Sequence, residues 1–321
     1  MPIQSENGFT RPQRLKEGDR IAITAPAMYN LDAEQTAFGI KTLENLGFTV
    51  VVGETVNRRY LNTTGTIAFR KREIENFFED KSIDAIICLI GGNNCFRLLD
   101  AINYDVVRDN PKIFSGMSDI THLQLAFLTK AKLMGLHGLD LFWGFGVPDD
   151  DLAKKYNIDL FVKCCMSNEP LGRIPHLSTW ETWRDGIANA PIIGGWFGAL
   201  KNMRKSLFYP SMAEYILFTE FVDIEPHKVQ RELANMKSSG FFCNVKGILV
   251  GQIVDCEEKK YPGKIPSIRE MIVEIADEYN LPVIGNVDFG HGDTNIPLPE
   301  GIIVEMDASN IDAKVLESFV V

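Results

Sequence analysis

The feature that most constrains the fold of this 321-residue chain is the almost unbroken apolar run Ile83–Ile90. A strand without polar alternation is typical of a parallel sheet whose two faces are both covered by helices. Further strand patterns lie at Arg20–Pro26, Phe48–Val52 and Lys112–Ser115, and helical periodicity fills the intervals at Asp32–Leu46, Ile67–Asp80 and from about Asn94. This alternation of strands and helices predicts a doubly wound parallel sheet.

The second half of the chain is organised differently. Its strand patterns are shorter and more scattered, at Tyr215–Thr219, Ile248–Val254, Pro282–Asn286 and Ile302–Glu305. One helix is predicted over His227–Met236, and another begins after Ser267, which fits a capping box with Glu270. We therefore predict an α/β fold with a flavodoxin-like N-terminal domain over residues 1–165, a linker rich in Pro, Gly, Ser and Asn over 166–182, and a smaller mixed α+β domain over 183–321.

The composition of the chain argues against two classes of binding partner, nucleic acids and membranes. The formal net charge of −10 argues against binding to nucleic acid through phosphate neutralisation. The first residues carry no basic, apolar leader, and no apolar run reaches the roughly 18–20 residues of a membrane span. The six cysteines include no CxxC pair and are predicted to be buried free thiols, which are typical of a reducing compartment. We expect a cytoplasmic protein with no nucleic-acid or membrane partner.

A serine stands at the predicted turn after the strand Lys112–Ser115, in the segment Gly116-Met117-Ser118-Asp119. A sharp strand-to-helix turn lifts a serine hydroxyl out of the sheet, and the helix N-terminus behind it offers free N–H groups to a developing oxyanion. This pattern indicates a serine nucleophile. The same residues would also form an ordinary glycine turn followed by a helix cap, and this segment alone favours the cap.

A serine nucleophile needs a general base and a group that orients the base. Of the five histidines, His291 stands between two glycines in an open loop after a strand, while His137 and His122 are further candidates. Glu220 follows an apolar strand and would place a carboxylate at the rim of the second sheet. A turn histidine and a strand-ending carboxylate without catalytic roles are the alternatives.

A second glycine turn, Gly91-Gly92-Asn93-Asn94, follows the run Ile83–Ile90. Its backbone N–H groups could bind an anion or complete an oxyanion hole. Alternatively, the glycines are present only because a tight turn requires a positive φ. The turn has neither the GxGxxG spacing nor the Gly-Lys-Ser/Thr ending of a P-loop. The sequence contains no metal motif, and Asp149-Asp150-Asp151 is better explained as the acidic start of a helix. We expect no cofactor and no metal.

Taken together, these segments resemble the LD-carboxypeptidase family of serine peptidases, which includes the microcin C self-immunity peptidases. The resemblance extends over nearly the whole chain, and the serine turn and the Gly-His segment are specific when they occur together in this order. The segments that carry it are Leu15–Ala22, Ala25-Pro26, Ile83–Ile86, Gly91–Asn94, Arg97–Asp100, Asn110–Phe114, Gly116–Thr121, His137-Gly138, Leu217–Glu220 and Asp288–His291.

The resemblance implies a catalytic triad of Ser118, His291 and Glu220 in a cleft between the two domains. It also implies an oxyanion hole formed by the N–H groups of Asp119 and Gly92, and a homodimer. The chain departs from the family pattern at three positions: Met117 for a common Tyr, Trp196 for the Asn of Gly-Gly-Asn, and Leu139 for the Pro of His-Gly-Pro. None of these departures touches the triad, but each could alter the choice of substrate.

Three functions stay open. A microcin-immunity type peptidase would cleave the amide that joins a peptide to an adenylate-like group, and it is slightly favoured because Asn93 and Asn94 replace the Tyr-Gly of other members. Trp180 or Trp183 would then stack on the base, and Asn93 would contact the substrate. An LD-carboxypeptidase would instead release D-alanine from a murein tetrapeptide during wall recycling. A catalytically silent protein would use the same cleft to bind a peptide or a nucleotide.

Overall fold

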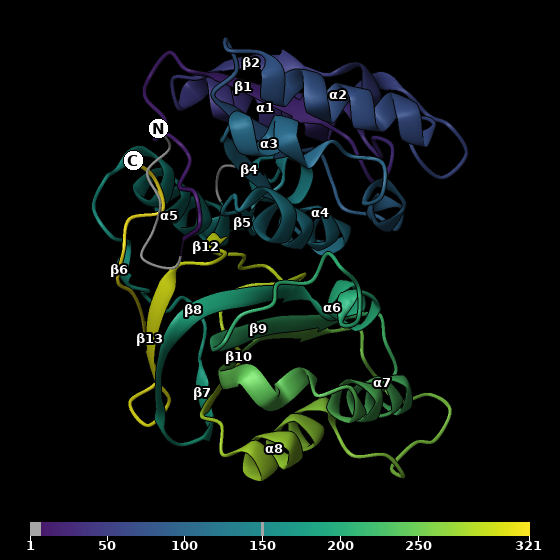
Figure 1. Cartoon of the computed structure of the whole chain (residues 1–321), viewed down its shortest axis with the longest axis vertical. Helices are drawn as coiled ribbons and strands as arrows, with labels where there is room; N and C mark the ends of the chain where they lie inside the picture. Colours follow the sequence, from purple (N-terminus) through teal and green to yellow (C-terminus); the bar gives the residue numbers. More distant parts are fainter. Residues whose placement is uncertain (1–7, 149–150) are drawn as a thin grey trace.

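The computed structural model describes residues 8–148 and 151–321, in two domains stacked one above the other (Figure 1). The first domain is built around a six-stranded sheet. Its strands are β1 (Arg20–Thr24), β2 (Thr49–Val52), β3 (Ala85–Cys88), β4 (Ile113–Gly116), β5 (Leu136–His137) and β12 (Leu298–Pro299). They lie in the order β2-β1-β3-β4-β5-β12; β12 is antiparallel to β5, and the other neighbours pair in parallel. The first five strands follow the flavodoxin-type order.

The helices of this domain form two groups. The helices are α1 (Ala33–Asn45), α2 (Ile67–Glu79), α3 (Tyr104–Asp109), α4 (Thr121–Ala126) and α5 (Leu152–Met166), and the short 3-10 and π turns are η1 (Glu54–Asn57), η2 (Cys95–Leu98), η3 (Ser118–Ile120), η4 (Phe127–Ala131) and η5 (Leu141–Phe145). Helices α1 and α5 both pack on η5, whereas α3 packs on α2 and η4. Asp32 and Asp151 each accept two backbone N–H groups, which explains where α1 and α5 begin.

The second domain is built around an eight-stranded mixed sheet. Its strands are β6 (Gly172–Arg173), β7 (Glu181–Arg184), β8 (Ile187–Trp196), β9 (Tyr215–Val222), β10 (Val245–Val254), β11 (Val283–Gly285), β13 (Ile303–Asp307) and β14 (Asp312–Val315). They lie in the order β6-β14-β13-β8-β9-β10-β11-β7. The helices are α6 (Phe197–Met203), α7 (Pro226–Ser238) and α8 (Ile268–Tyr279), with the 3-10 turn η6 (Phe241–Asn244). Four parallel strands, β8 to β11, form the centre of this sheet.

The structure confirms the predicted α/β fold class and most of the predicted elements. The apolar run Ile83–Ile90 contains β3, all four residues of which are buried, and β3 lies between β1 and β4 in the sheet. The capping box of Ser267 and Glu270 is present at the start of α8. The helix expected after Asn94 is shorter than predicted, since only the turn η2 forms there. Asp151 caps α5 as expected, while Asp149 and Asp150 lie outside the described residues.

The two domains exchange segments, so no single cut of the chain separates the two sheets. The segment predicted as a linker contributes β6, which pairs with β14 at the edge of the second sheet. In the opposite direction, β12 leaves the second domain and pairs with β5 of the first. The C-terminal Val321 also returns to the first domain, where its N–H donates to the carbonyl of Pro12 at 3.1 Å. Figure 1 shows this end of the chain beside α5.

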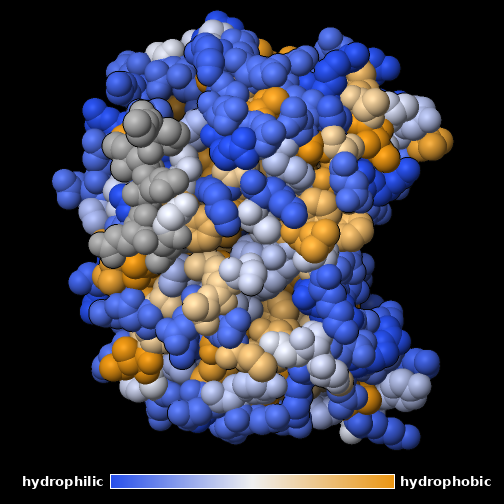
Figure 2. Space-filling view, in the orientation of Figure 1, coloured by the Kyte–Doolittle hydropathy of each residue, from blue (hydrophilic) through white to orange (hydrophobic). Residues whose placement is uncertain are grey.

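Hydrophobic surface is concentrated between the domains. Figure 2 shows hydrophilic residues over most of the two outer ends, with pale and orange residues more frequent around the waist where the domains meet. Within the described ranges, none of the helices combines the length and the apolarity that crossing a bilayer requires.

Candidate active site

Ser118 occupies a sharp turn directly after β4. Its φ angle is 60°, a left-handed conformation that is strained for any residue other than glycine. The turn η3 begins at Ser118 and continues into α4, so the local geometry is that of a nucleophile elbow. Gly91 of the neighbouring turn leaves room for this serine, because a Cβ at that position would lie 2.7 Å from the Ser118 Cβ.

The side chains of Ser118, His291 and Glu220 form a continuous hydrogen-bonded chain. The Nε2 atom of His291 lies 3.0 Å from the Ser118 Oγ, and its Nδ1 atom lies 2.9 Å from the Glu220 Oε2. Glu220 is on β9 and is fully buried, whereas the His291 side chain is 23% exposed. The second carboxylate oxygen of Glu220, Oε1, is buried and has no hydrogen-bond partner within the described residues. A hydroxyl, an imidazole and a carboxylate in this order can activate a serine as a nucleophile.

The loop that carries His291 is fixed by close packing and by Asn295. Gly290 has a φ of 118°, and a Cβ at that position would lie 2.9 Å from the Glu220 Cβ, so the loop passes directly over the carboxylate. The Asn295 side chain accepts the N–H of Gly290 at 3.2 Å and donates to the carbonyl of Gly138 at 2.8 Å. Because Gly138 follows β5, Asn295 ties the histidine loop to the domain that carries the serine.

The two turns that would hold an oxyanion are joined by the side chain of Asp119. This carboxylate accepts the backbone N–H groups of Asn94 at 2.6 Å and Cys95 at 2.8 Å, so the serine turn holds the end of the Gly91–Asn94 turn. Burial alone would raise the pKa of Asp119, but hydrogen bonds from His122, Cys95 and Asn94 outweigh burial and hold its pKa below the usual value. The backbone of Asp119 follows the serine directly.

A cleft of about 720 Å³ opens beside Ser118 and His291. Both halves of the chain line it. The first half contributes Met28, Leu31, Gly92, Met117, Asp140 and Trp143, and the second half contributes Trp196, Val222, Asp223, Asp255 and Asp293. A cavity of this size holds a small peptide or a ligand of similar size. Substrate bound here would contact both domains at once.

Asp140 is a buried carboxyl group in the wall of this cleft. Its Oδ1 accepts the N–H groups of Trp143 at 2.7 Å and Gly144 at 3.3 Å, and its Oδ2 has no hydrogen-bond partner in the described part of the chain. Burial raises the pKa of Asp140 to about 7, against the opposing effect of the two N–H groups and of nearby His291. No pattern in the sequence singles out Asp140, although it follows β5 by only three residues.

The other two histidine candidates do not reach the cleft. His122 is buried, and its Nδ1 lies 2.9 Å from the carbonyl oxygen and 3.1 Å from a carboxylate oxygen of Asp119. His137 is fully buried on β5 beside the ring of Phe218, and both its ring nitrogens are without partners among the described residues. Burial lowers the pKa of His137 to about 3, so this side chain stays neutral.

The structure does not bring the predicted substrate-binding residues into the cleft lining. The Trp180 indole is only 3% exposed, stacks on His176, and donates to the carboxylate of Asp288 at 3.0 Å. Trp183 lies on the edge strand β7, against Gly285 of β11. Asn93 is exposed, and its side-chain oxygen accepts from Asn94 and Asn62.

Two other tryptophans line the cleft instead. Trp143 is 57% exposed at the cleft, and Trp196 stands at the end of β8, paired with Glu220 of β9. Trp196 could be suspected from the sequence, because it departs from the family's Gly-Gly-Asn segment. Which tryptophan faces a cavity depends on tertiary packing, which sequence spacing does not encode.

One group of side chains in the described ranges brings possible metal ligands within 4.8 Å of one another: Glu225, His227 and Glu258. The contacts of Glu258 have a structural explanation, since it accepts the N–H groups of His227, Lys260 and Tyr261 and so anchors the loop after β10. None of the three residues lines the cleft beside Ser118.

Two family models match this chain. Residues 21–138 match the LD-carboxypeptidase N-terminal domain, and residues 189–306 match the LD-carboxypeptidase C-terminal domain. Together they cover well over half of the sequence, and the chain belongs to the LD-carboxypeptidase family. The first matched range contains Ser118, and the second contains Glu220. The family predicted from the sequence is thereby confirmed.

Relatives whose names point to different functions align with this chain over nearly its full length. The probable murein peptide carboxypeptidase of Bacillus subtilis is 26% identical over 301 residues, covering 93% of this chain and 92% of the relative. The microcin C7 self-immunity protein MccF of Escherichia coli is 26% identical over 353 residues, covering 99% and 98%. The crystal structure of an MccF-like protein from Bacillus anthracis is 26% identical, with a TM-score of 0.84 over 95% of this chain and 99% of that chain.

Proposed function

We propose that the protein is a serine peptidase that hydrolyses an amide bond at the carboxyl end of a small peptide or peptide-like conjugate. The observation that carries this proposal is the hydrogen-bonded chain from Ser118 through His291 to Glu220 at the edge of the cleft. Membership of the LD-carboxypeptidase family supports the same reaction class. A catalytically silent binding protein would have no use for all three groups in this geometry.

In the proposed mechanism, the Ser118 Oγ attacks the carbonyl carbon of the amide while the His291 Nε2 accepts its proton. Glu220 accepts the hydrogen bond from the His291 Nδ1–H, fixes the tautomer, and stabilises the imidazolium that forms. The N–H groups of Asp119 and Gly92 bind the oxyanion of the tetrahedral intermediate. His291 then protonates the leaving amine, and a water molecule, deprotonated by His291, hydrolyses the acyl-enzyme.

The first substrate class is a peptide joined to a flat group such as a nucleotide, which is the substrate expected of a microcin-immunity type peptidase. The exposed indole of Trp143 supports it, because this ring forms an apolar wall of the cleft together with Met28 and Leu31. An aromatic ring in a cleft can stack on a planar ligand. Trp143 thus takes the stacking role that the sequence analysis gave to Trp180 or Trp183.

The second substrate class is a murein tetrapeptide, from which the enzyme would release D-alanine. The carboxylates of Asp223, Asp255 and Asp293 support it, since all three line the cleft and would attract a substrate that carries a free amino group. Asp223 and Asp255 have φ angles of 47° and 52°, so the ends of β9 and β10 hold them in strained positions facing this region.

The test compares the wild type with Ser118→Ala on two substrates: an L,D-linked murein tetrapeptide and an aspartyl sulfamoyl adenosine, with products identified by mass spectrometry. Ser238→Ala is the matched control, because Ser238 is exposed on α7 and bonds only within its own helix. We expect hydrolysis of one substrate by the wild type and the control, and a loss of at least about 10³-fold in Ser118→Ala. Hydrolysis that survives in Ser118→Ala would contradict the mechanism.

A further inference from the structure

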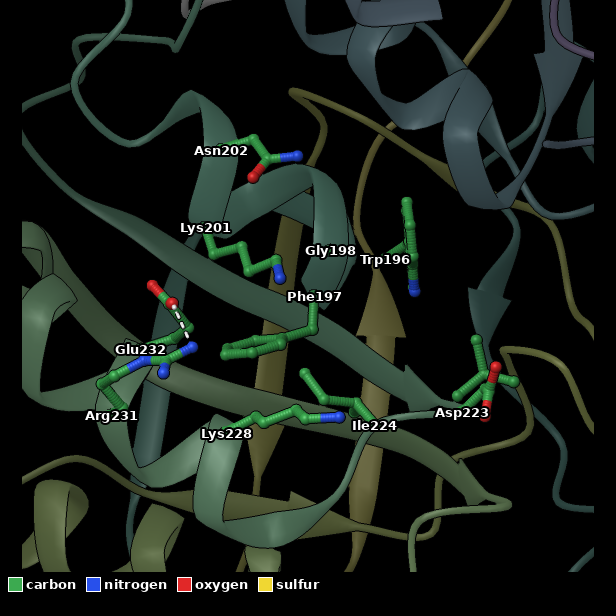
Figure 3. A pocket seen from close by; sticks show the side chains of 11 residues that line it. Trp196, Phe197, Gly198, Lys201, Asn202, Asp223, Ile224, Lys228, Arg231 and Glu232 are labelled. Atoms are coloured by element: carbon green, nitrogen blue, oxygen red, sulfur yellow. Dashed lines mark ion pairs between the residues drawn. The ribbon is translucent and has the colours of Figure 1, made fainter. Parts of the chain in front are cut away.

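A second cavity, of about 290 Å³, adjoins the catalytic cleft. The two cavities share Trp196, Val222 and Asp223, so they lie side by side at the end of β9, which carries Glu220. Figure 3 shows Trp196 standing at one side of this second cavity, which lies between α6 and α7. We call it the side chamber.

Cationic side chains from two helices enter the side chamber. Lys201 extends from α6 and Lys228 from α7, with the ring of buried Phe197 between them, and Arg231 lies one turn further along α7 (Figure 3). The lining also contains the carboxylates of Asp223 and Glu232, so the cations outnumber the anions by one in a chain with a net charge of −10. An aromatic ring flanked by two ammonium groups is suited to a short apolar stem that ends in an anion.

The pairing of these charges leaves one cation available. Lys228 pairs with Glu225 at 2.8 Å, and Arg231 pairs with Glu232 at 3.6 Å. The half-buried ammonium of Lys201 has no hydrogen-bond or ion-pair partner among residues 8–148 and 151–321. A partly desolvated ammonium without a counter-ion gains most from an anionic ligand.

We propose that the side chamber is a specificity subsite that binds an anionic group of the substrate, a carboxylate or a phosphate, through Lys201 with support from Lys228. The inference rests on the proposed peptidase function and adds to it a preference for substrates that carry this anion. Asp223 lines both the side chamber and the cleft, and its carboxylate repels an anion at this boundary. The anion therefore sits deeper, between α6 and α7.

Binding to the Ser118→Ala variant tests the subsite without turnover. Calorimetry would measure Kd for three matched pairs: acetyl-glutamyl- and acetyl-glutaminyl-D-alanine, acetyl-phosphoseryl- and acetyl-seryl-D-alanine, and acetyl-alanyl-D-glutamate and acetyl-alanyl-D-glutamine. We expect the anionic member of at least one pair to bind about tenfold tighter than its neutral partner, as is usual for one charge-assisted hydrogen bond. The pair that shows this preference identifies the anion and the side of the scissile bond that enters the chamber.

Lys201→Met, added to Ser118→Ala, should reduce that preference to less than about twofold and leave the Kd of the neutral peptide unchanged. Lys205→Met is the matched control, because Lys205 is exposed just beyond α6 and does not line the chamber. The proposal is overturned if no pair shows a preference, or if Lys201→Met and Lys205→Met change it equally. Hydrolysis of the same peptides by the enzyme with Ser118 intact reports the peptidase function separately.

Discussion

At the scale of single residues, the proposed mechanism depends on Ser118 being held in a conformation that serine avoids. A non-glycine residue in the left-handed region costs roughly 1–3 kcal/mol, which the surrounding packing has to offset. Here β4 leads into the turn, and Ser118 meets His291 at 3.0 Å. The strain keeps the hydroxyl exposed to the cleft, and the hydrogen bond keeps it aligned with its base.

The charge of Glu220 should matter more than its shape. Glu220→Gln keeps the size of the side chain but removes the carboxylate that fixes the His291 tautomer, so we expect kcat to fall by roughly 10³–10⁴-fold with little change in KM. Steady-state kinetics, with circular dichroism to confirm the fold, would measure this. Glu305→Gln on the exposed face of β13 is the matched control. A loss below tenfold would show that Glu220 does not assist the base.

Asp140 should make stability depend on pH. Burial raises its pKa in the folded protein to about 7, from an ordinary value of 3.8. A raised pKa stabilises the fold fully below the unfolded-state value, and this contribution is lost as pH rises towards the folded-state value. Between pH 4 and pH 8, the unfolding free energy of the wild type should therefore fall by up to about 4 kcal/mol more than that of Asp140→Asn. Urea denaturation at the two pH values would measure it; equal losses in both proteins would refute the prediction.

At the scale of elements, the site is an arrangement of turns at the ends of strands. The turn after β3 lies against the serine turn after β4, and the carboxylate of Asp119 holds the two together. From the other domain, the end of β9 supplies Glu220 and the loop after β11 supplies His291. Ligand sites at the carboxyl ends of parallel strands are the rule in open α/β sheets.

Gly91→Ala should displace Ser118 from its position in this arrangement of turns. The new Cβ would lie 2.7 Å from the Cβ and 3.0 Å from the Oγ of Ser118, so the serine must move. We expect kcat/KM to fall about 10²-fold or more, because a misplacement of about 1 Å has this effect. Gly263→Ala is the control: it has a φ of 68° and nothing within 4 Å of the new Cβ, so it changes stability alone. Equal activities in the two variants would contradict the packing argument.

The sequence was sufficient for the elements with strong local signals. Continuous apolar runs indicated β3, β9 and β10, helical periodicity indicated α1, and the capping box of Ser267 and Glu270 indicated where α8 begins. It was insufficient for β8, whose residues Ile187–Trp196 include Pro191 and two adjacent glycines and read as irregular chain. The two-residue strands β6 and β12 exist only through their partners, so no local pattern predicts them.

The same distinction applies to the site. Ser118, His291 and Glu220 were identified as residues, and the structure brings them together. The prediction that Trp180 or Trp183 contacts substrate depended on which indole faces the cleft, and the structure buries Trp180 against Asp288. Whether an indole is buried depends on contacts with distant segments of the chain, and a single sequence does not show those contacts.

At the scale of the whole molecule, the domains are held together by the segment around β12. The N–H of Glu300 donates to Gly135 of the first domain at 2.9 Å, and the N–H of Gly301 donates to Ile192 of β8 at 2.8 Å. The Glu300 carboxyl is fully buried at this junction, and neither oxygen has a hydrogen-bond partner in the part of the chain that the structure describes. Burial raises the pKa of Glu300 well above its usual value.

This buried acid should make the junction sensitive to alkaline pH. Because the pKa of Glu300 is raised in the folded state, its contribution to stability is present below the unfolded-state pKa and is lost as pH rises through the folded-state pKa. Glu300→Gln removes this titration, so the free energy of unfolding should fall less between pH 5 and pH 9 in the variant than in the wild type. Denaturation curves at both pH values would show this, and an unchanged difference would contradict it.

The central claim is that Ser118, activated by His291 and Glu220, is the nucleophile. The most direct measurement is reaction of the folded protein with a fluorophosphonate, followed by peptide mass spectrometry to locate the adduct. We expect one adduct, on Ser118, that is absent from Ser118→Ala and forms much more slowly in Glu220→Gln. An adduct on another residue, or a folded wild type that does not react, would contradict it.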